Sequence, residues 1–248
     1  MPAAHMSGTG NAVGLYGKLP AAGDFVTRAL PSAFVAPWDD WLQRSLVASR
    51  AQLAERWIAI YLESPIWRFA LQPQVCGPQA WTGMLMPSVD RAGRYFPLTL
   101  VAPIEPGSSL LLTMTAAEHW YAHLERVALS ALKPDATLQT METELARLPL
   151  VPVPSSAQAH DDWMIAQELS RWWMLPDKPF SVHIPASHAL PAITEFAAVH
   201  LMEAQGRQRT IWWMRDSPGR SIALRVWQGL PPPDEYAALL SGAPGPSR

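Results

Sequence analysis

Cysteine is nearly absent from this chain of 248 residues, which contains only Cys76. One cysteine can form neither an internal disulfide nor a Cys-rich metal cage, and this usage is typical of a reducing compartment. Long runs of one charge are also absent, and 19 Lys and Arg residues nearly balance 21 Asp and Glu residues. Since binding to a phosphate backbone requires a basic field, we expect no nucleic-acid partner.

Two kinds of apolar segment are missing as well. The first eleven residues, MPAAHMSGTGN, have no basic cluster followed by an apolar core, so they do not resemble a secretory signal. The apolar stretch 109–129 is interrupted by Glu118, His119 and Glu125 before it reaches the ~20 residues of a membrane crossing. We therefore expect a soluble, cytoplasmic protein without membrane insertion.

The residues that are present indicate a globular protein. Apolar residues make up 49% of the chain and charged residues 16%, which is enough apolar surface to offset the entropy of ordering the chain. We predict one domain over residues 12–241, with disordered tails at 1–11 and 242–248. The 12 tryptophans suit either a wide core or a protein-binding surface, and composition does not choose between them.

Periodicity predicts interleaved strands and helices. Strands are expected over residues 13–18, 66–73, 82–87, 95–104 and 179–185 and in a hairpin around 216–219, and helices over 32–61, from 115 onward, and over 135–148, 161–174, 189–206 and 232–240. The order shows no strict βαβ repeat, which predicts a mixed, largely antiparallel sheet with helices on both faces. The three prolines of 149–158 make it the one credible linker, although the similar flanking segments favour an ordinary surface crossing.

The first candidate site is the stretch KLPAAGDFVTR, residues 18–28, which contains Lys18, Asp24 and Arg28. A Gly-Asp pair occurs in the nucleophile block of one esterase class, but there a serine follows the aspartate and here the residue is Phe25. Neither Gly-rich phosphate-binding pattern occurs. The pattern favours a strand-to-helix turn in which Asp24 accepts backbone N–H groups.

The second candidate site is PSVDRAGRYFPL, residues 87–98. Asp90 and Gly93 suit the first and fourth positions of a β-turn, from which Arg91 and Arg94 project. Two arginines at a loop tip could bind a carboxylate or phosphate, or Arg94 could pair with Asp90 and stiffen the turn. A surface ion pair contributes only ~0–1 kcal/mol, so both interpretations remain open.

Other chemical patterns are weak. His119 and His123 are four residues apart on a predicted helix, as in some zinc sites, but no third ligand has convincing spacing. The numbers of serine and histidine residues do not exclude a Ser/His/Asp triad, but the G-x-S-x-G motif that positions a nucleophilic serine does not occur. In a strand, Trp212 and Trp213 would point to opposite faces and pack on a helix layer at each side. We therefore expect no catalytic residue, metal or cofactor.

Three blocks of the sequence together resemble the TagF (ImpM) family of type VI secretion-associated proteins. These are residues 14–43, residues 67–100 and the later SRWWM at 170–174. The resemblance is specific over residues 12–104 and looser to the final helix. The family's signature positions correspond here to Gly17, Lys18, Pro20, Gly23, Asp24, Phe25, Pro87, Ser88, Asp90, Arg91, Gly93, Arg94, Tyr95, Phe96 and Pro97.

The resemblance implies a three-layer α/β/α sandwich without enzymatic activity. It further implies a cytoplasmic, post-translational repressor of type VI secretion that binds and sequesters the forkhead-associated (Fha) scaffold protein. We predict that the two loops meet in a polar patch for this partner, formed by Lys18, Asp24, Arg28, Asp90, Arg91, Arg94 and Tyr95. The alternatives are a structural adaptor of the secretion apparatus and a hydrolase with Asp24 and Asp90 in a cleft.

Overall fold

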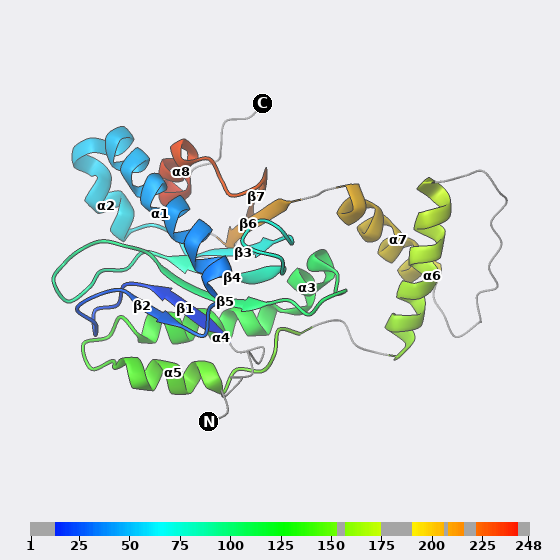
Figure 1. Cartoon of the computed structure of the whole chain (residues 1–248), viewed down its shortest axis with the longest axis horizontal. Coiled ribbons are helices and arrows are strands. Elements are labelled where there is room, and N and C mark those ends of the chain that lie inside the picture. The colour runs from blue at the N-terminus through cyan, green and yellow to red at the C-terminus, as the bar shows by residue number, and fades with distance from the viewer. Residues whose placement is uncertain (1–12, 153–156, 175–189, 206–207, 216–221, 243–248) are drawn as a thin grey trace, which may run out of the picture.

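The strands that the structure describes form one sheet of seven strands, which Figure 1 shows in the context of the chain. The computed structural model describes residues 13–152, 157–174, 190–205, 208–215 and 222–242. The strands are β1 (Gly14–Gly17), β2 (Val26–Arg28), β3 (Trp67–Leu71), β4 (Trp81–Met86), β5 (Leu98–Pro103), β6 (Arg209–Arg215) and β7 (Ile222–Gln228), in the spatial order β2-β1-β5-β4-β3-β6-β7. Each neighbouring pair is antiparallel. The α/β prediction is confirmed, but the prediction of a mixed sheet is wrong for the described strands.

Helices lie on both faces of this sheet (Figure 1). They are α1 (Ser32–Leu53), α2 (Trp57–Leu62), α3 (Leu110–Ala116), α4 (Glu118–Ser130), α5 (Leu138–Ala146), α6 (Ala157–Met174), α7 (Leu190–Gln205) and α8 (Tyr236–Ser241). One buried cluster joins α1, α2 and α8 to the sheet, and a second joins α3, α4 and α5 to alternate residues of the same strands. None of the described helices is long and apolar enough to cross a membrane.

The neighbouring tryptophans of β6 divide between these two clusters, as the strand periodicity predicts. Trp212 is fully buried and stacks on Trp38 of α1, with ring centroids 5.9 Å apart. Trp213 points to the opposite face and meets Tyr121 of α4 edge to face at 5.1 Å. The tryptophans of β6 therefore serve the core, with one on each side of the sheet.

The N-terminal region differs from the prediction at two points. Residues 18–28 do not form a strand-to-helix turn, because Val26–Arg28 forms strand β2 and pairs with β1 in a hairpin. The helix predicted over 32–61 is interrupted at Ala54, which has a positive φ of 47° and begins a short 3₁₀ turn before α2. Because a right-handed helix requires a negative φ, α1 ends at this residue and α2 follows as a separate helix.

Helices α6 and α7 pack on each other around a small cluster of their own, formed by Ala166, Ile193 and Ala197 (Figure 1). The Glu203 carboxylate at the end of α7 accepts the Ser109 hydroxyl and the Leu111 N–H, each at 2.9 Å, and so joins α7 to the start of α3. The predicted strand 179–185, the turn 216–219 and almost all of the predicted tails lie outside the described residues.

Candidate partner-binding site

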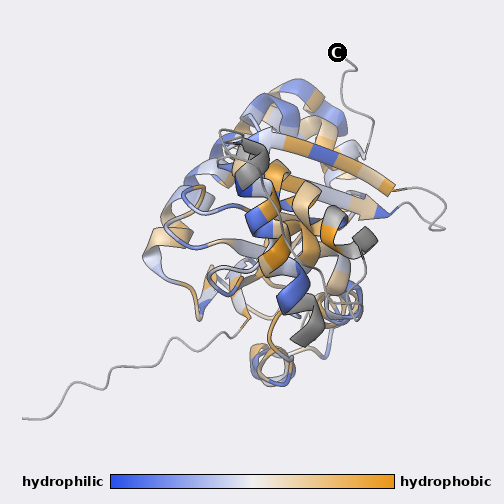
Figure 2. Cartoon of the chain, turned by 90° about the vertical axis from the view of Figure 1, so that its right-hand side faces the viewer, coloured by the Kyte–Doolittle hydropathy of each residue, from blue (hydrophilic) through white to orange (hydrophobic). Residues whose placement is uncertain are grey.

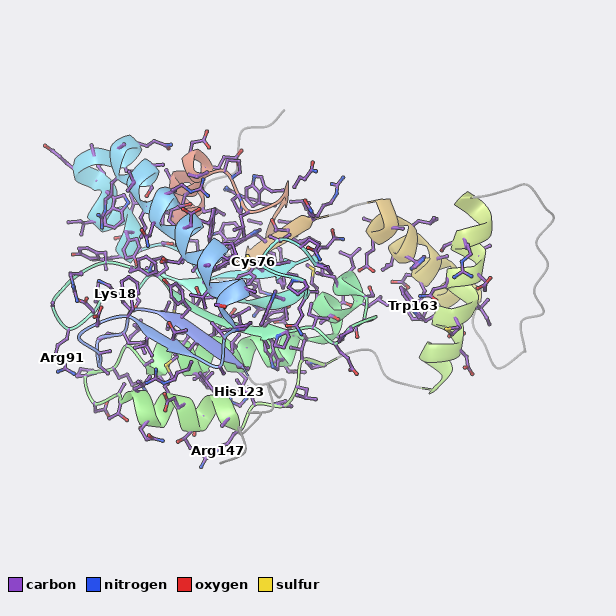
Figure 3. The ribbon with its side chains drawn as sticks, viewed as in Figure 1. Lys18, Cys76, Arg91, His123, Arg147 and Trp163 are labelled. Carbon is purple, nitrogen blue, oxygen red and sulfur yellow. The ribbon has the colours of Figure 1, made fainter. Side chains whose placement is uncertain are left out.

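Two loops at one end of the sheet meet in what we call the loop patch, residues 18–25 and 88–96. The first loop joins β1 to β2 and the second joins β4 to β5, which lies next to β1. The Ser88 hydroxyl donates to the Lys18 carbonyl at 2.7 Å, and the Arg91 N–H donates to the Ala22 carbonyl at 3.1 Å. Figure 3 shows Lys18 and Arg91 at the same end of the molecule.

Asp90 lies at the centre of the loop patch. Its side chain is fully buried, and one carboxylate oxygen, Oδ2, accepts Lys18 Nζ at 3.0 Å and Arg94 Nε at 2.6 Å. The other oxygen, Oδ1, accepts the backbone N–H groups of Ala92 and Arg94, each at 2.9 Å. The Gly93 N–H donates to the Asp90 carbonyl at 2.9 Å, which confirms the predicted β-turn. Asp90 therefore both shapes its own turn and binds the first loop through Lys18.

The pKa of Asp90 follows from these contacts. Burial by itself opposes ionisation, but the Arg94 N–H, the Lys18 ammonium and the Arg94 guanidinium together hold the pKa of this carboxyl well below its usual range. The carboxylate is thus charged at neutral pH, with both oxygens occupied by donors.

Acid is expected to destabilise the protein through Asp90. The folded pKa lies below the unfolded value of about 3.9, so the contribution is complete above about pH 4 and is lost as the pH falls through the folded pKa. We expect the unfolding temperature of the native chain to fall more steeply below about pH 4 than that of Asp90→Asn, which has no carboxyl there. Circular dichroism melts from about pH 6 to about pH 2 measure both slopes, and parallel slopes would contradict the prediction.

The two arginines of the second loop hold the first loop through its backbone. Arg94 Nη2 donates to the Gly23 carbonyl at 2.7 Å, and Arg91 Nη2 donates to the Ala21 carbonyl at 2.6 Å. The Arg94 side chain is nevertheless 55% exposed, and Arg91 is exposed. Each guanidinium carries five N–H donors, so both retain donors that face solvent. The pairing of Arg94 with Asp90 is therefore confirmed, whereas binding of a carboxylate or phosphate by the two arginines stays a prediction.

Aromatic rings add an apolar element to the loop patch. Phe25 is 44% exposed, although its ring meets that of Phe96 edge to face at 4.7 Å and has Lys18 Nζ 4.9 Å from its centroid. Sequence reasoning placed Phe25 among the family's signature positions but not among the site residues. Tyr95 packs edge to face on Trp57 and Tyr61, each at 5.6 Å, and so joins the second loop to α2.

Two predicted site residues, Asp24 and Arg28, have hydrogen-bond partners outside the second loop. Arg28 is exposed, and its Nε donates to Glu142 of α5 at 2.5 Å. Asp24 is exposed and accepts the N–H of Phe25 at 2.8 Å, which is the local turn role that the sequence predicts. Nothing in the sequence indicates Glu142 as a partner, because 114 positions separate it from Arg28.

The same geometry bears on the hydrolase alternative. A general base needs an oxygen that can reach a substrate proton, whereas both oxygens of Asp90 are buried and already accept donors. Cys76 is buried, and burial raises the pKa of its thiol to about 12. The described part of the chain, which includes His119 and His123, contains no group of three or more His, Cys, Asp or Glu residues arranged to hold a metal ion.

The fold and the loop patch together define an antiparallel α/β protein in which a buried ion pair joins two loops. Comparison with known proteins identifies the family to which the chain belongs within this class. The family model described as "TagF N-terminal domain, Type VI secretion system-associated" matches residues 14–148, more than half of the chain. The protein belongs to the TagF family of type VI secretion-associated proteins, as the sequence blocks predict.

A solved structure extends the similarity beyond residue 148. This is the crystal structure of PA0076 from Pseudomonas aeruginosa PAO1. The sequence of PA0076 is 34% identical to that of this chain, and the two structures superpose with a TM-score of 0.75. The alignment covers 96% of this chain and 97% of PA0076. A search of curated proteins gives no match.

Proposed function

We propose that this protein is a non-enzymatic, post-translational repressor of type VI secretion that acts in the cytoplasm by binding and sequestering the Fha scaffold protein. The observation that carries the proposal is the family match over residues 14–148, which associates the chain with the secretion system. The identity of the partner and the sense of regulation come from the resemblance of the sequence to the family. We further propose that the sheet and its helices form the three-layer α/β/α sandwich that the resemblance implies.

The loop patch supports a protein partner. A preformed surface loses little conformational entropy on binding, and here the Lys18–Asp90 pair and four carbonyl contacts hold the two loops together before any partner arrives. Interfaces are enriched in arginine and aromatic residues. The loop patch presents both, because Arg91, Arg94 and the ring of Phe25 are all exposed on its two loops.

The proposal distinguishes two roles within the loop patch. Lys18, Asp90 and Tyr95 position the loops, because their contacts are made inside the protein. Phe25 and Arg91 present surface to a partner. Asp24 is also exposed, and Arg28 pairs with Glu142 outside the loop patch, so we assign Arg28 the smallest part in binding.

Reversing one charge of the loop patch tests the binding role. We expect Arg91→Glu to weaken capture of the Fha scaffold by on the order of tenfold, because an exposed guanidinium at the interface is replaced by a carboxylate. Isothermal titration calorimetry with the purified scaffold measures the affinity. Arg44→Glu is the matched control, since Arg44 is also an exposed arginine but lies on α1 and pairs with Asp40. A folded Arg91→Glu protein that binds as tightly as the native chain would assign this arginine a structural role only.

Secretion assays separate the three functional classes. Deleting the gene is expected to increase type VI secretion if the protein is a repressor, whereas an adaptor would be required for secretion. The hydrolase alternative requires turnover of an ester or phosphoester that Asp24→Ala abolishes without unfolding the chain. Co-purification of the scaffold from the native cytoplasm, together with increased secretion after deletion, is the result that we expect.

A further inference from the structure

Among the strands that the structure describes, β7 lies at one edge of the sheet, and its own sequence lacks the usual protective features of an edge strand. At the other edge, β2 has only three residues and includes charged Arg28. Short length and charge are the usual means by which proteins prevent edge strands from pairing with other chains. Strand β7 has seven residues without proline or lysine, and its one charged side chain, Arg225, turns onto the Trp67 ring at 5.2 Å.

An apolar row lies along this edge. Ile222, Leu224 and Val226 are 60%, 61% and 48% exposed, and they alternate with less exposed residues. Because Leu224 pairs with Trp213, the row lies on the same sheet face as that ring. In the described part of the chain, Leu224 and Val226 of this row line an apolar groove of about 450 Å³, whose other walls include Met114 of α3 and Met202 of α7. Figure 2 shows β7 as the outer strand, coloured mainly as apolar.

The backbone of the same three residues points outward. In an antiparallel ladder, alternate residues direct their N–H and C=O groups to the neighbouring strand. The Gly229 N–H donates to the Gln208 carbonyl at 2.6 Å, and this contact continues the register of β6 with β7. Alternation from Gly229 directs residues 223, 225 and 227 toward β6. The N–H and C=O groups of Ile222, Leu224 and Val226 therefore face the open edge.

We propose that β7 pairs with β7 of a second copy of this chain, and that this pairing joins two sheets across a two-fold axis at Leu224. In this register Leu224 lies opposite the second copy's Leu224, and Ile222 lies opposite the second copy's Val226. All three residues then contribute their outward N–H and C=O groups, and the two apolar rows meet on one face.

The side chain of Arg225 selects this register over the next one. Centring the pair on residue 225 would place two Arg225 side chains directly opposite each other on one face, and like charges in that position are destabilising. Centring it on Leu224 places Arg225 opposite the second copy's Ala223. Of these two registers, only the one centred on Leu224 keeps the two arginines from lying opposite each other, and this self-complementary pairing favours a second copy over an unrelated extended segment.

The size of the interface sets the expected strength. Ile222, Leu224, Val226 and Met202, each about half to two-thirds exposed, present on the order of 300 Å² of apolar surface per copy, which is comparable to the largest apolar patch of a typical monomer. Stable dimers bury about 800 Å² per partner, so this edge gives a small interface even with the strand backbones included. The dimer is expected to dissociate on dilution, in the micromolar range of about 1–100 µM.

Sedimentation velocity of the full chain over about 1–100 µM tests the proposal. We expect a shift from monomer to dimer across this range. Leu224→Lys should raise the dissociation constant at least ~100-fold, because each dimer then contains two buried lysines. Ile222→Lys provides a second variant at an equally exposed position. Val47→Lys is the matched control, since Val47 is a 69% exposed apolar residue on α1, and it should leave the dimer unchanged.

Residue-resolved hydrogen exchange gives a readout that does not depend on a variant. The amides of 222, 224 and 226 should become protected only as the protein concentration rises, whereas those of 223, 225 and 227 should be protected at every concentration. A monomer at all concentrations, or a dimer that Leu224→Lys and Ile222→Lys do not weaken, would overturn the proposal. So would protection of the outward amides by the Fha scaffold alone, which would assign the edge to that partner.

These tests distinguish failure of the dimer proposal from failure of the proposed function. The loop patch is built on the loops next to β1, and the sheet order places four strands between β1 and β7. Leu224→Lys is therefore expected to leave capture of the scaffold by a single chain unchanged, while Arg91→Glu is expected to leave the dimer unchanged.

Discussion

Replacing Trp38 by alanine is expected to lower the free energy of unfolding by ~3–5 kcal/mol. The Trp38 side chain is fully buried between α1 and the sheet, and its ring lies 4.8 Å from that of Phe69 and 5.9 Å from that of Trp212. The substitution removes these contacts and leaves a cavity that the surrounding rings cannot close. It also removes the donor of the hydrogen bond from Trp38 Nε1 to Thr99 Oγ1 at 2.9 Å, which leaves a buried hydroxyl without this partner.

Urea unfolding followed by circular dichroism measures this loss. Val47→Ala is the matched control on the same helix, because Val47 is 69% exposed and its truncation should change the free energy of unfolding by no more than ~0.5 kcal/mol. Loss of less than ~1 kcal/mol for Trp38→Ala would show that this ring does not hold α1 on the sheet.

Gly17→Ala is the second substitution with a large expected effect, a loss of ~2–4 kcal/mol. Gly17 has a φ of 132°, and a Cβ added there would lie 2.1 Å from the Pro97 carbonyl oxygen. The carbonyl oxygen is a backbone atom and the added Cβ is bonded directly to the backbone, so neither atom can rotate away. Strand β1 would therefore have to move away from β5. The next residue is Lys18, so the substitution should also separate the two loops and weaken capture of the scaffold.

Two glycines of the loop patch, Gly93 and Gly23, serve as graded controls. Gly93 has a φ of 77° but open space around a Cβ, so Gly93→Ala should cost only the conformational strain of about 1 kcal/mol. Gly23 has open space and no positive φ, so Gly23→Ala should change the free energy of unfolding by less than ~0.5 kcal/mol. Equal effects of all three substitutions on urea unfolding would contradict the close approach of β1 to Pro97.

Local sequence signals predicted most of the described elements. The strands β3, β4 and β5 and the helices α4 to α7 follow from apolar periodicity, and the turn at Asp90 and Gly93 follows from its residue types. These features depend on windows of a few residues, in which the sequence itself sets the preferred backbone conformation. The short strand β2 has three residues, of which only Val26 is buried, so no alternation was long enough to reveal it.

The loop patch was predicted only in part for the same reason. The sequence indicated two polar loops and the resemblance associated them, but 72 positions separate Lys18 from Asp90 and no local pattern encodes their pairing. The sequence likewise grouped Arg28 with Lys18, whereas the β1–β2 hairpin carries Arg28 to Glu142 of α5. Sequence reasoning undervalued Phe25, because exposure of an aromatic ring is decided by what packs around it.

The sequence alone determined the α/β class, the family and the two charged loops, because composition, periodicity and signature residues are properties of short segments. The tertiary structure decided that every described strand pair is antiparallel, that Asp90 is buried between two cations, and that β7 lies at an edge of the described sheet. These features depend on which distant segments become neighbours, and that choice is made by packing of the two cores over the whole chain.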